Sequence, residues 1–291
     1  MLPSTKGDAL SNRERLRGIT AKIQHGKDQL SALDDAIRAF VNSDDFAVTV
    51  EGDPDTSQMI VWGEGSTDPP WLDWGIRVGD VIHNWRSALD HLVWELSDIR
   101  SGPTPADPIP AGNRWRDVNF PIVTDETKWN SRTGQGLWAI DGRLQAICKG
   151  LQPFETRKRH VPPGPADRET LAVLQELWNI DKHRRIHFTE IEISLNRIKL
   201  LAVETGAWVP HLFAVKPSPR PFKGKAELAR LTVLATEVPK QGLHVEVDWE
   251  LAYDILFEQG APGYGAGLLD TLQSIRDTLD GIVIEFEPEF A

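Results

Sequence analysis

The side chains best suited to chemistry in this chain lie within one stretch, residues 80–91. There, residues that belong on a buried helix face are interspersed with ionisable and amide side chains. An imidazole transfers protons near neutral pH, and a guanidinium holds oxyanions through paired hydrogen bonds. Because polar groups taken from water cost free energy unless they find partners, the stretch predicts either a buried polar network or a working site. The residues concerned are Asp80, Asn84, Arg86, Asp90 and His91.

The spacing of these residues predicts which of them share a helix face. At about 100° per residue, one polar stripe runs along the helix at spacings of four, three and four. Arg86 and Asp90 are four residues apart and can pair on a neighbouring stripe. Because apolar residues flank the polar stripe on both sides, we expect the stripe to face a bundle, a cleft or a subunit contact. Its members are Asp80, Asn84, Ser87 and His91.

A second polar segment, residues 178–187, ends another predicted helix. Asp181 shares a face with Leu174 and Leu177, so its carboxylate is expected to point inward. An inward carboxylate needs a cationic or hydrogen-bonding partner, and we expect the two segments to touch. The candidate partners are Arg86, His91 and Asn84.

Two interpretations follow from the residues alone. In the first, the polar residues form a structural network centred on an Arg86–Asp181 or a His91–Asp181 pair. In the second, they hold a metal ion, since His183 and His187 are four residues apart. No Glu-x-x-His pair accompanies them, and a strand predicted from residue 188 would end the helix before His187. We therefore expect no metal site. The side chains that would join such a site are Asp181, His83 and His91.

A third interpretation comes from a resemblance. Arg86-Ser87-Ala88-Leu89-Asp90-His91 is an R-x4-H arrangement on a predicted helix, and it resembles the motif of HEPN-domain proteins. These are helical bundles in which an Arg, a polar neighbour and a His act together. Many are metal-independent ribonucleases of toxin–antitoxin, abortive-infection and CRISPR systems, and they usually work as dimers. The resemblance covers about residues 70–190.

This resemblance implies a function in RNA cleavage and phage defence, with RNA as substrate, a homodimer as the active form and no cofactor. His91 would move a proton to or from the ribose 2′-hydroxyl or the leaving oxygen, and Arg86 would hold the phosphate. The products would be a 2′,3′-cyclic phosphate and a 5′-hydroxyl. The orienting residues would be Asn84, Asp90 and Asp181. The residues near the substrate would be Lys182, His183 and Arg184.

The alternative function belongs to another class: a non-enzymatic binding or interaction protein, in which the polar helix pair only fixes the packing. A wider pattern leaves this choice open. Asn84-x-Arg86-Ser87-Ala88-Leu89-Asp90-His91-Leu92, followed by Asn179-Ile180-Asp181-Lys182-His183-Arg184, is similar to a widespread group of bacterial and phage proteins. That similarity brings no activity with it.

The composition of the chain narrows the functional classes that remain. The chain has 291 residues and a formal net charge of −11, which argues against broad, non-specific binding to nucleic acid, because neutralising phosphates supplies most of that affinity. The single cysteine, Cys148, excludes an internal disulfide and is expected to be a small buried hydrophobe. We see no signal peptide and no run of about 18 apolar residues. A cytoplasmic protein without a membrane contact is expected.

These motifs are placed on a predicted α+β fold. Apolar periodicity predicts a helical core over residues 8–42, 71–99, 138–187 and 266–286, with about four long helices. Alternating patterns predict a hairpin near residues 46–62 and a sheet part over about residues 188–250. We expect one domain, 1–291, in which the helical bundle packs with an antiparallel sheet of about four to six strands.

Overall fold

The computed structural model describes residues 11–53, 58–65, 68–101, 117–158, 170–203, 224–232, 245–264 and 266–291. The chain divides into two compact units, and each is assembled from separate segments. Unit 1 comprises Met1–Ala32, Gly75–Ile186 and Asp270–Ala291, and unit 2 comprises Leu33–Trp74 and His187–Leu269. The single domain expected over residues 1–291 stays a prediction.

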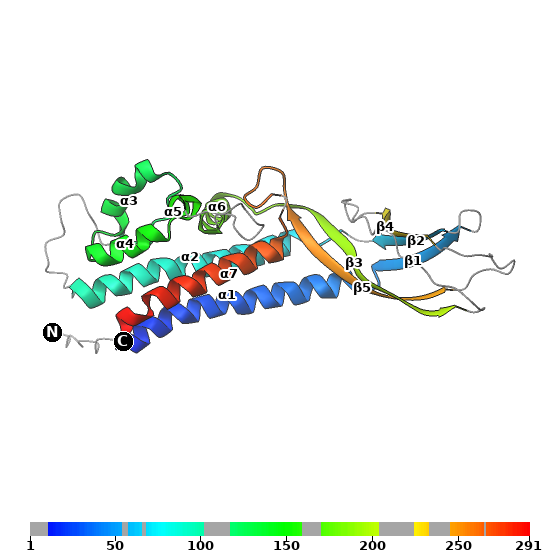
Figure 1. Ribbon diagram of the computed structural model, residues 1–291, viewed down its shortest axis with the longest axis horizontal. Helices are drawn as coiled ribbons and strands as arrows, with labels where there is room; N and C mark the ends of the chain where they lie inside the picture. Colours follow the sequence, from blue (N-terminus) through cyan, green and yellow to red (C-terminus); the bar gives the residue numbers. More distant parts are fainter. Residues whose placement is uncertain are drawn as a thin grey trace, which may run out of the picture. The chain divides into compact units, whose positions relative to one another are not determined.

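Three long helices dominate the fold (Figure 1). They are α1 (Asn12–Val41), α2 (Trp71–Ser101) and α7 (Leu268–Phe286). The predicted ranges 8–42, 71–99 and 266–286 are confirmed to within a few residues at each end. The start of α1 is fixed by a capping box, in which the Glu14 backbone N–H donates to Ser11 Oγ at 3.3 Å and the Ser11 N–H donates to the Glu14 carboxylate at 2.8 Å.

Apolar stripes at helical spacing form the core. On α7 the buried positions recur at alternating intervals of four and three, and on α1 they recur at threes, fours and sevens, as an amphipathic helix requires. Each fully buried aliphatic side chain stabilises the fold by about 1.5–3 kcal/mol relative to exposure. The buried residues of α7 are Leu268, Leu272, Ile275, Leu279, Ile282 and Phe286, and those of α1 are Ile19, Ile23, Leu30, Leu33, Ile37 and Val41.

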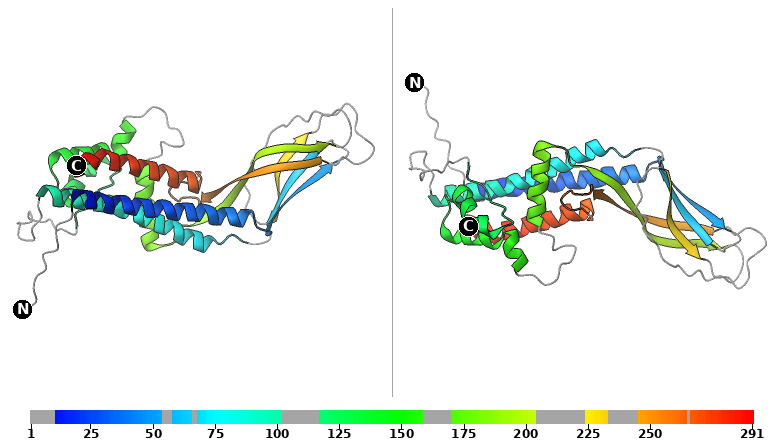
Figure 2. Two further views of the ribbon diagram at one scale, coloured as in Figure 1. Left: turned by 90° about the horizontal axis from the view of Figure 1, so that it is seen from below. Right: turned by 90° about the horizontal axis from the view of Figure 1, so that it is seen from above.

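Helices α1 and α2 run antiparallel in unit 1, side by side in the views of Figure 2. The buried indole of Trp85 donates to the Ile23 carbonyl oxygen of α1 at 3.2 Å. The ring lies against Gly26, where an added Cβ would be 2.2 Å from Trp85 Nε1. A glycine is therefore required at this crossing by the space that the indole fills.

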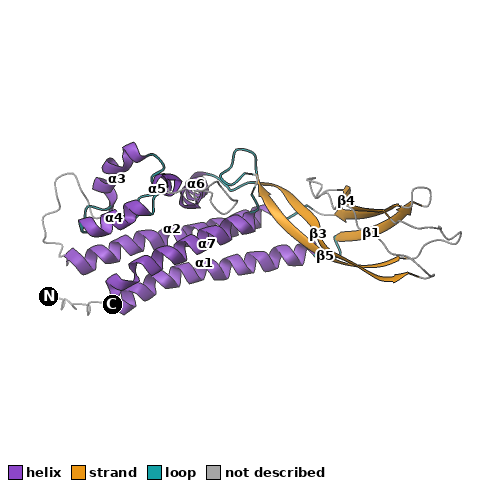
Figure 3. Cartoon of the chain, viewed as in Figure 1, coloured by secondary structure: helices purple, strands orange, loops and turns teal. Residues whose placement is uncertain are grey.

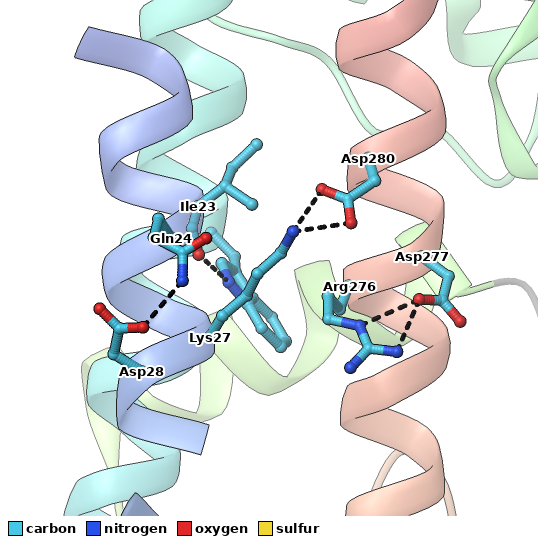
Figure 4. A network of polar contacts seen from close by, with 8 residues as sticks. Ile23, Gln24, Lys27, Asp28, Arg276, Asp277 and Asp280 are labelled. Carbon is cyan, nitrogen blue, oxygen red and sulfur yellow. Dashed lines mark hydrogen bonds and ion pairs between the residues drawn. The ribbon is translucent and has the colours of Figure 1, made fainter. Parts of the chain in front are cut away.

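Helix α7 is tied to α1 by an ion pair (Figure 4). The Lys27 ammonium lies 2.8 Å from the Asp280 carboxylate, and both side chains are partly exposed. Such a partly exposed pair contributes little, typically up to about 1 kcal/mol. The apolar stripes rather than this pair therefore hold the two helices together.

The helical stretch expected over residues 138–187 is divided into separate helices. These are α4 (Gly142–Gly150), α5 (Pro153–Lys158) and α6 (Thr170–His183), and residues 159–169 lie outside the described ranges. Two short helices, η2 (Glu126–Lys128) and α3 (Trp129–Gly136), precede them, and η4 (Glu287–Phe290) follows α7. Cys148 on α4 is buried as expected, and burial raises the pKa of its thiol to about 12.

The strands of unit 2 form two antiparallel sheets within the described residues, not the one sheet that was predicted (Figure 3). β1 (Phe46–Asp53), β2 (Gln58–Gly65) and β4 (Gly224–Thr232) form a sheet in the order β1-β2-β4. β3 (Phe188–Val203) pairs with β5 (Val245–Phe257). The expected hairpin is confirmed, with Phe46 opposite Gly65 and Asp53 opposite Gln58. Helices combined with antiparallel strands agree with the α+β class.

Candidate functional site on helix α2

Arg86 is buried in unit 1, with 4% of its surface exposed. Its guanidinium donates through three nitrogens: Nη1 to the Asp90 carboxylate at 2.5 Å, Nη2 to the Phe120 carbonyl oxygen at 2.9 Å and Nε to Gln175 Oε1 at 3.0 Å. The guanidinium carbon also lies 5.0 Å from the centre of the Trp178 ring. We call these five residues the Arg86 cluster.

The cluster joins three segments of unit 1. Arg86 and Asp90 come from α2, Gln175 and Trp178 from α6, and Phe120 from an extended segment before η2. The Phe120 backbone N–H donates to the same Asp90 oxygen at 3.0 Å, so one carboxylate binds both the arginine and the loop. The loop is held at its N–H and its C=O, as a buried backbone requires. The Arg86 cluster thus has the features of a closed structural network.

Asp181 does not pair with Arg86 or His91, so both predicted centres of the network are wrong. The Asp181 carboxylate lies against α2 at Gly79, where a Cβ would be 2.2 Å from its Oδ1. Desolvation raises the pKa of Asp181, the nearby Asp80 carboxylate raises it further, and His83 lowers it. The predicted contact between the two polar segments is confirmed. Its register differs from expectation because Gly79, without a side chain, leaves room for the carboxylate about two turns before the arginine.

The residues that follow Asp181 are exposed. Lys182 lies over Trp178, with its ammonium 3.1 Å from the ring centre, and its pKa is lowered by desolvation and by the Arg86 charge. His183 and Arg184 are exposed at the end of α6. These three residues, expected near a substrate, therefore lie at an open surface, and only Lys182 reaches the Arg86 cluster.

The polar stripe of α2 does not face inward as predicted. Asp80 and His91 are exposed, and Asn84 and Ser87 are partly exposed. The stripe follows one edge of α1, where Asn84 Nδ2 donates to Gln29 Oε1 at 3.0 Å and Lys22 Nζ donates to Ser87 Oγ at 3.0 Å. The stripe lies at the edge of the contact with α1, where polar side chains of α1 meet it on one side only. The apolar residues next to the stripe therefore do not bury it.

His91 and Arg86 therefore lie on different faces of the same helix. Five residues at about 100° each separate their directions by about 140°. Partial desolvation lowers the pKa of His91, Lys22 lowers it further, and Glu95 and Asp90 raise it. The imidazole is thus favoured in its neutral form near pH 7. Arg86 and His91 are not brought together in one chain, although Asp90 lies between them in sequence.

Three residues of the network were missed from the sequence. On α6, Trp178 stands one turn and Gln175 two turns before Lys182, and neither is a carboxylate or an imidazole. Lys22 of α1 is half-buried and hydrogen-bonded to Ser87, although its position among other charged residues on that helix is typical of a solvated face. The i, i+3 spacing of Gln175 and Trp178 on the face toward α2 was the available signal for the first two.

Within the described ranges, no group of three or more His, Cys, Asp and Glu side chains is arranged to hold a metal ion. None of the helices in that part of the chain has both the length and the apolar character needed to cross a bilayer. Comparison with known proteins finds no matching family, no similar curated protein and no similar solved structure. Function must therefore be argued from the two faces of α2.

Proposed function

We propose that this chain is a non-enzymatic binding or interaction protein, in which the polar contacts between α2 and α6 fix the packing. One observation carries the proposal. The guanidinium of Arg86, the group that would have to hold a substrate phosphate, is covered and bound at three nitrogens by protein oxygens. A buried cation that is already neutralised has little affinity left for a second anion.

The cost of releasing Arg86 supports the same proposal. A substrate phosphate would have to replace the Asp90 carboxylate, and that carboxylate also holds the Phe120 N–H. Breaking one partner out of a buried ion pair costs about 3–5 kcal/mol. Binding a phosphate at Arg86 would therefore disrupt the contact between α2, α6 and the Phe120 segment.

An RNA-cleavage assay on the folded chain tests this proposal. Purified protein is incubated with total RNA without added metal, next to Arg86→Ala and His91→Ala. We expect no cleavage above buffer from any of the three, and a loss of stability in Arg86→Ala alone. Cleavage by the wild type that disappears in a folded His91→Ala variant would overturn the proposal.

A second candidate is the HEPN-like, metal-independent ribonuclease or an inactive derivative of one, acting on RNA as a cytoplasmic homodimer. One observation favours it: His91 is exposed and its pKa is lowered, so a neutral imidazole is available as a general base. In this candidate Asp90 and Asn84 would orient His91, and a second copy of the chain would supply the missing cation. Cleavage that rises with protein concentration as dimers form would support it.

A further inference from the structure

Lys22 and Lys27 lie on the same helix but differ in their polar partners. Lys22 is half-buried on α1 and donates to the neutral Ser87 hydroxyl at 3.0 Å. In the described part of the chain, no carboxylate lies within ion-pair distance of Lys22. Lys27, five residues further along the same helix, lies 2.8 Å from the Asp280 carboxylate (Figure 4). A partly desolvated ammonium without an opposite charge is unfavourable and has affinity for an anion.

The neighbouring carboxylates are already engaged. Arg15 binds Glu95 at 2.5 Å and also binds Asp98. Asp90 binds the buried Arg86 at 2.5 Å. An anion approaching Lys22 therefore meets acids whose charge is largely balanced by their own arginines.

The antiparallel contacts between α1 and α2 leave the space beside Lys22 open. Arg15 is opposite Glu95, and Lys22 is opposite Ser87. Gly18 lies between the two α1 residues and His91 between their α2 partners, so the antiparallel arrangement places the two at about the same level along the helix pair. A Cβ added at Gly18 would meet nothing within 4 Å. Gly18 and the His91 side chain are both exposed, so no side chain fills the surface next to Gly18.

Three hydrogen-bond donors therefore border this open space: the Lys22 ammonium, the Ser87 hydroxyl and the His91 ring N–H, which the neutral imidazole retains. The titratable groups that act on His91 are Lys22 from α1 and Asp90 and Glu95 from α2. Trp94, one turn after His91, is 41% exposed and offers an aromatic face to a ligand that carries more than the anion.

We propose that Lys22, Ser87 and His91, at about the level of Gly18, form a binding site for an oxyanion of the phosphate class. The ammonium supplies the positive charge, and the hydroxyl and the imidazole donate hydrogen bonds that orient the oxyanion. The proposal rests on the binding function proposed above, for which it names a ligand class. Arg86 takes no part in it. The site therefore lies on the opposite side of α2 from the Arg86 cluster.

The first test titrates inorganic phosphate into the full chain at low salt. NMR follows the His91 imidazole, whose resonance is identified by its loss in His91→Gln, and calorimetry measures the affinity. We expect saturable binding that raises the pKa of His91. Lys22→Gln should weaken binding at least tenfold, as losing a charge-assisted hydrogen bond implies. Lys27→Gln, which removes a paired lysine from the same helix, should leave the affinity unchanged.

A second pair of variants tests the open space. Gly18→Ala should keep both the fold and the binding, because the methyl group meets nothing. Gly18→Leu should also fold, but its larger side chain should cover His91 and weaken phosphate binding at least tenfold. Equal affinity in these two variants, equal affinity in Lys22→Gln and Lys27→Gln, or no phosphate response at about 10 mM, ten times a Kd of about 1 mM, would overturn the proposal.

Ribose 5-phosphate and adenosine 5′-monophosphate distinguish the sources of the anion. Tighter binding of the nucleotide than of the sugar phosphate would assign the aromatic contact to Trp94, and equal binding of all three would assign the site to the anion alone. Both outcomes support the oxyanion site. Failure of the phosphate tests leaves the RNA-cleavage result unaffected, so this inference and the proposed function fail separately.

Discussion

The two faces of α2 in unit 1 differ in almost every physical respect. On one face, Arg86 is buried and bound by protein atoms at three nitrogens. On the other, His91 is exposed beside the half-buried Lys22, which donates to a neutral hydroxyl and has no carboxylate partner among the described residues. In sequence the two residues form one R-x4-H motif. In the structure the arginine contributes to packing and the histidine faces solvent, so the spacing of a motif does not establish that its members act together.

Among the variants considered, replacing Arg86 should lower the free energy of unfolding most. A small effect would contradict the assignment of this face of α2 to packing. Arg86→Ala leaves the Asp90 carboxylate without its cation and the Phe120 carbonyl without its donor. We expect a loss of about 3–5 kcal/mol in the free energy of unfolding, measured by urea denaturation. Arg86→Lys should lose less stability than Arg86→Ala, because lysine keeps the positive charge although it cannot reproduce the planar set of guanidinium donors. A change below about 1 kcal/mol in Arg86→Ala would show that the face is not a structural network.

Two glycines of α1 allow a test of the difference between the packed interior and the open surface of the helix pair. At Gly26 an added Cβ would lie 2.2 Å from the buried Trp85 ring, whereas at Gly18 it would meet nothing within 4 Å. Gly26→Ala should therefore destabilise the fold by about 1–3 kcal/mol through overpacking. Gly18→Ala should stabilise it by up to about 1 kcal/mol through helix propensity. Thermal denaturation measures both variants, and changes of the same sign would contradict this assignment.

Asp181 should show a smaller effect that depends on pH. Its raised pKa means that its contribution to stability is complete below its ordinary value of 3.8 and is lost as the pH rises through the raised value. Asp181→Asn should therefore be more stable than the wild type at pH 7, by less than about 1 kcal/mol. The gain should disappear toward pH 4. Asp80→Asn, which removes the facing charge, serves as the matched control and should give part of the same gain.

The smallest effect is expected at His91. Because the folded-state pKa is lowered, the contribution of His91 is complete above its ordinary value of 6.5 and is lost as the pH falls through the lowered value. His91→Gln should change stability at pH 7 by less than about 0.5 kcal/mol. It should also flatten the decline in stability below pH 6.5, as followed by urea denaturation at several pH values. A large loss at pH 7 would mean that the histidine is also part of the packing.

The sequence allowed the three long helices and the contact between α2 and α6 to be predicted. The apolar stripe of α7 from Leu268 to Phe286 is regular enough to set its bounds within two residues. The partner of Asp181 could not be predicted, because the register of two packed helices depends on where a small residue such as Gly79 admits a side chain. Periodicity predicts which face of a helix is buried, but not the register in which that face packs against a second helix.

The sheets were harder to predict for a related reason. β3 runs without a break from Phe188 to Val203, but its pairing with β5 shifts between Leu195 and Arg197. An irregularity of this kind interrupts the alternation of side chains without ending the strand. The pairing of β4 with β2 joins residues far apart in the chain, and local patterns carry no signal for such a partner.

The indole of Trp85 seated at Gly26 has a consequence for the whole helix pair. Two helices of this length could in principle dock in alternative alignments that differ by one turn, about 5.4 Å. A large ring that fits only where α1 has no side chain, and that also donates to the Ile23 carbonyl oxygen, excludes the neighbouring alignments. The alignment that brings the surface residues of the two helices together, Lys22 and Ser87 among them, is thus determined by a tryptophan and a glycine inside.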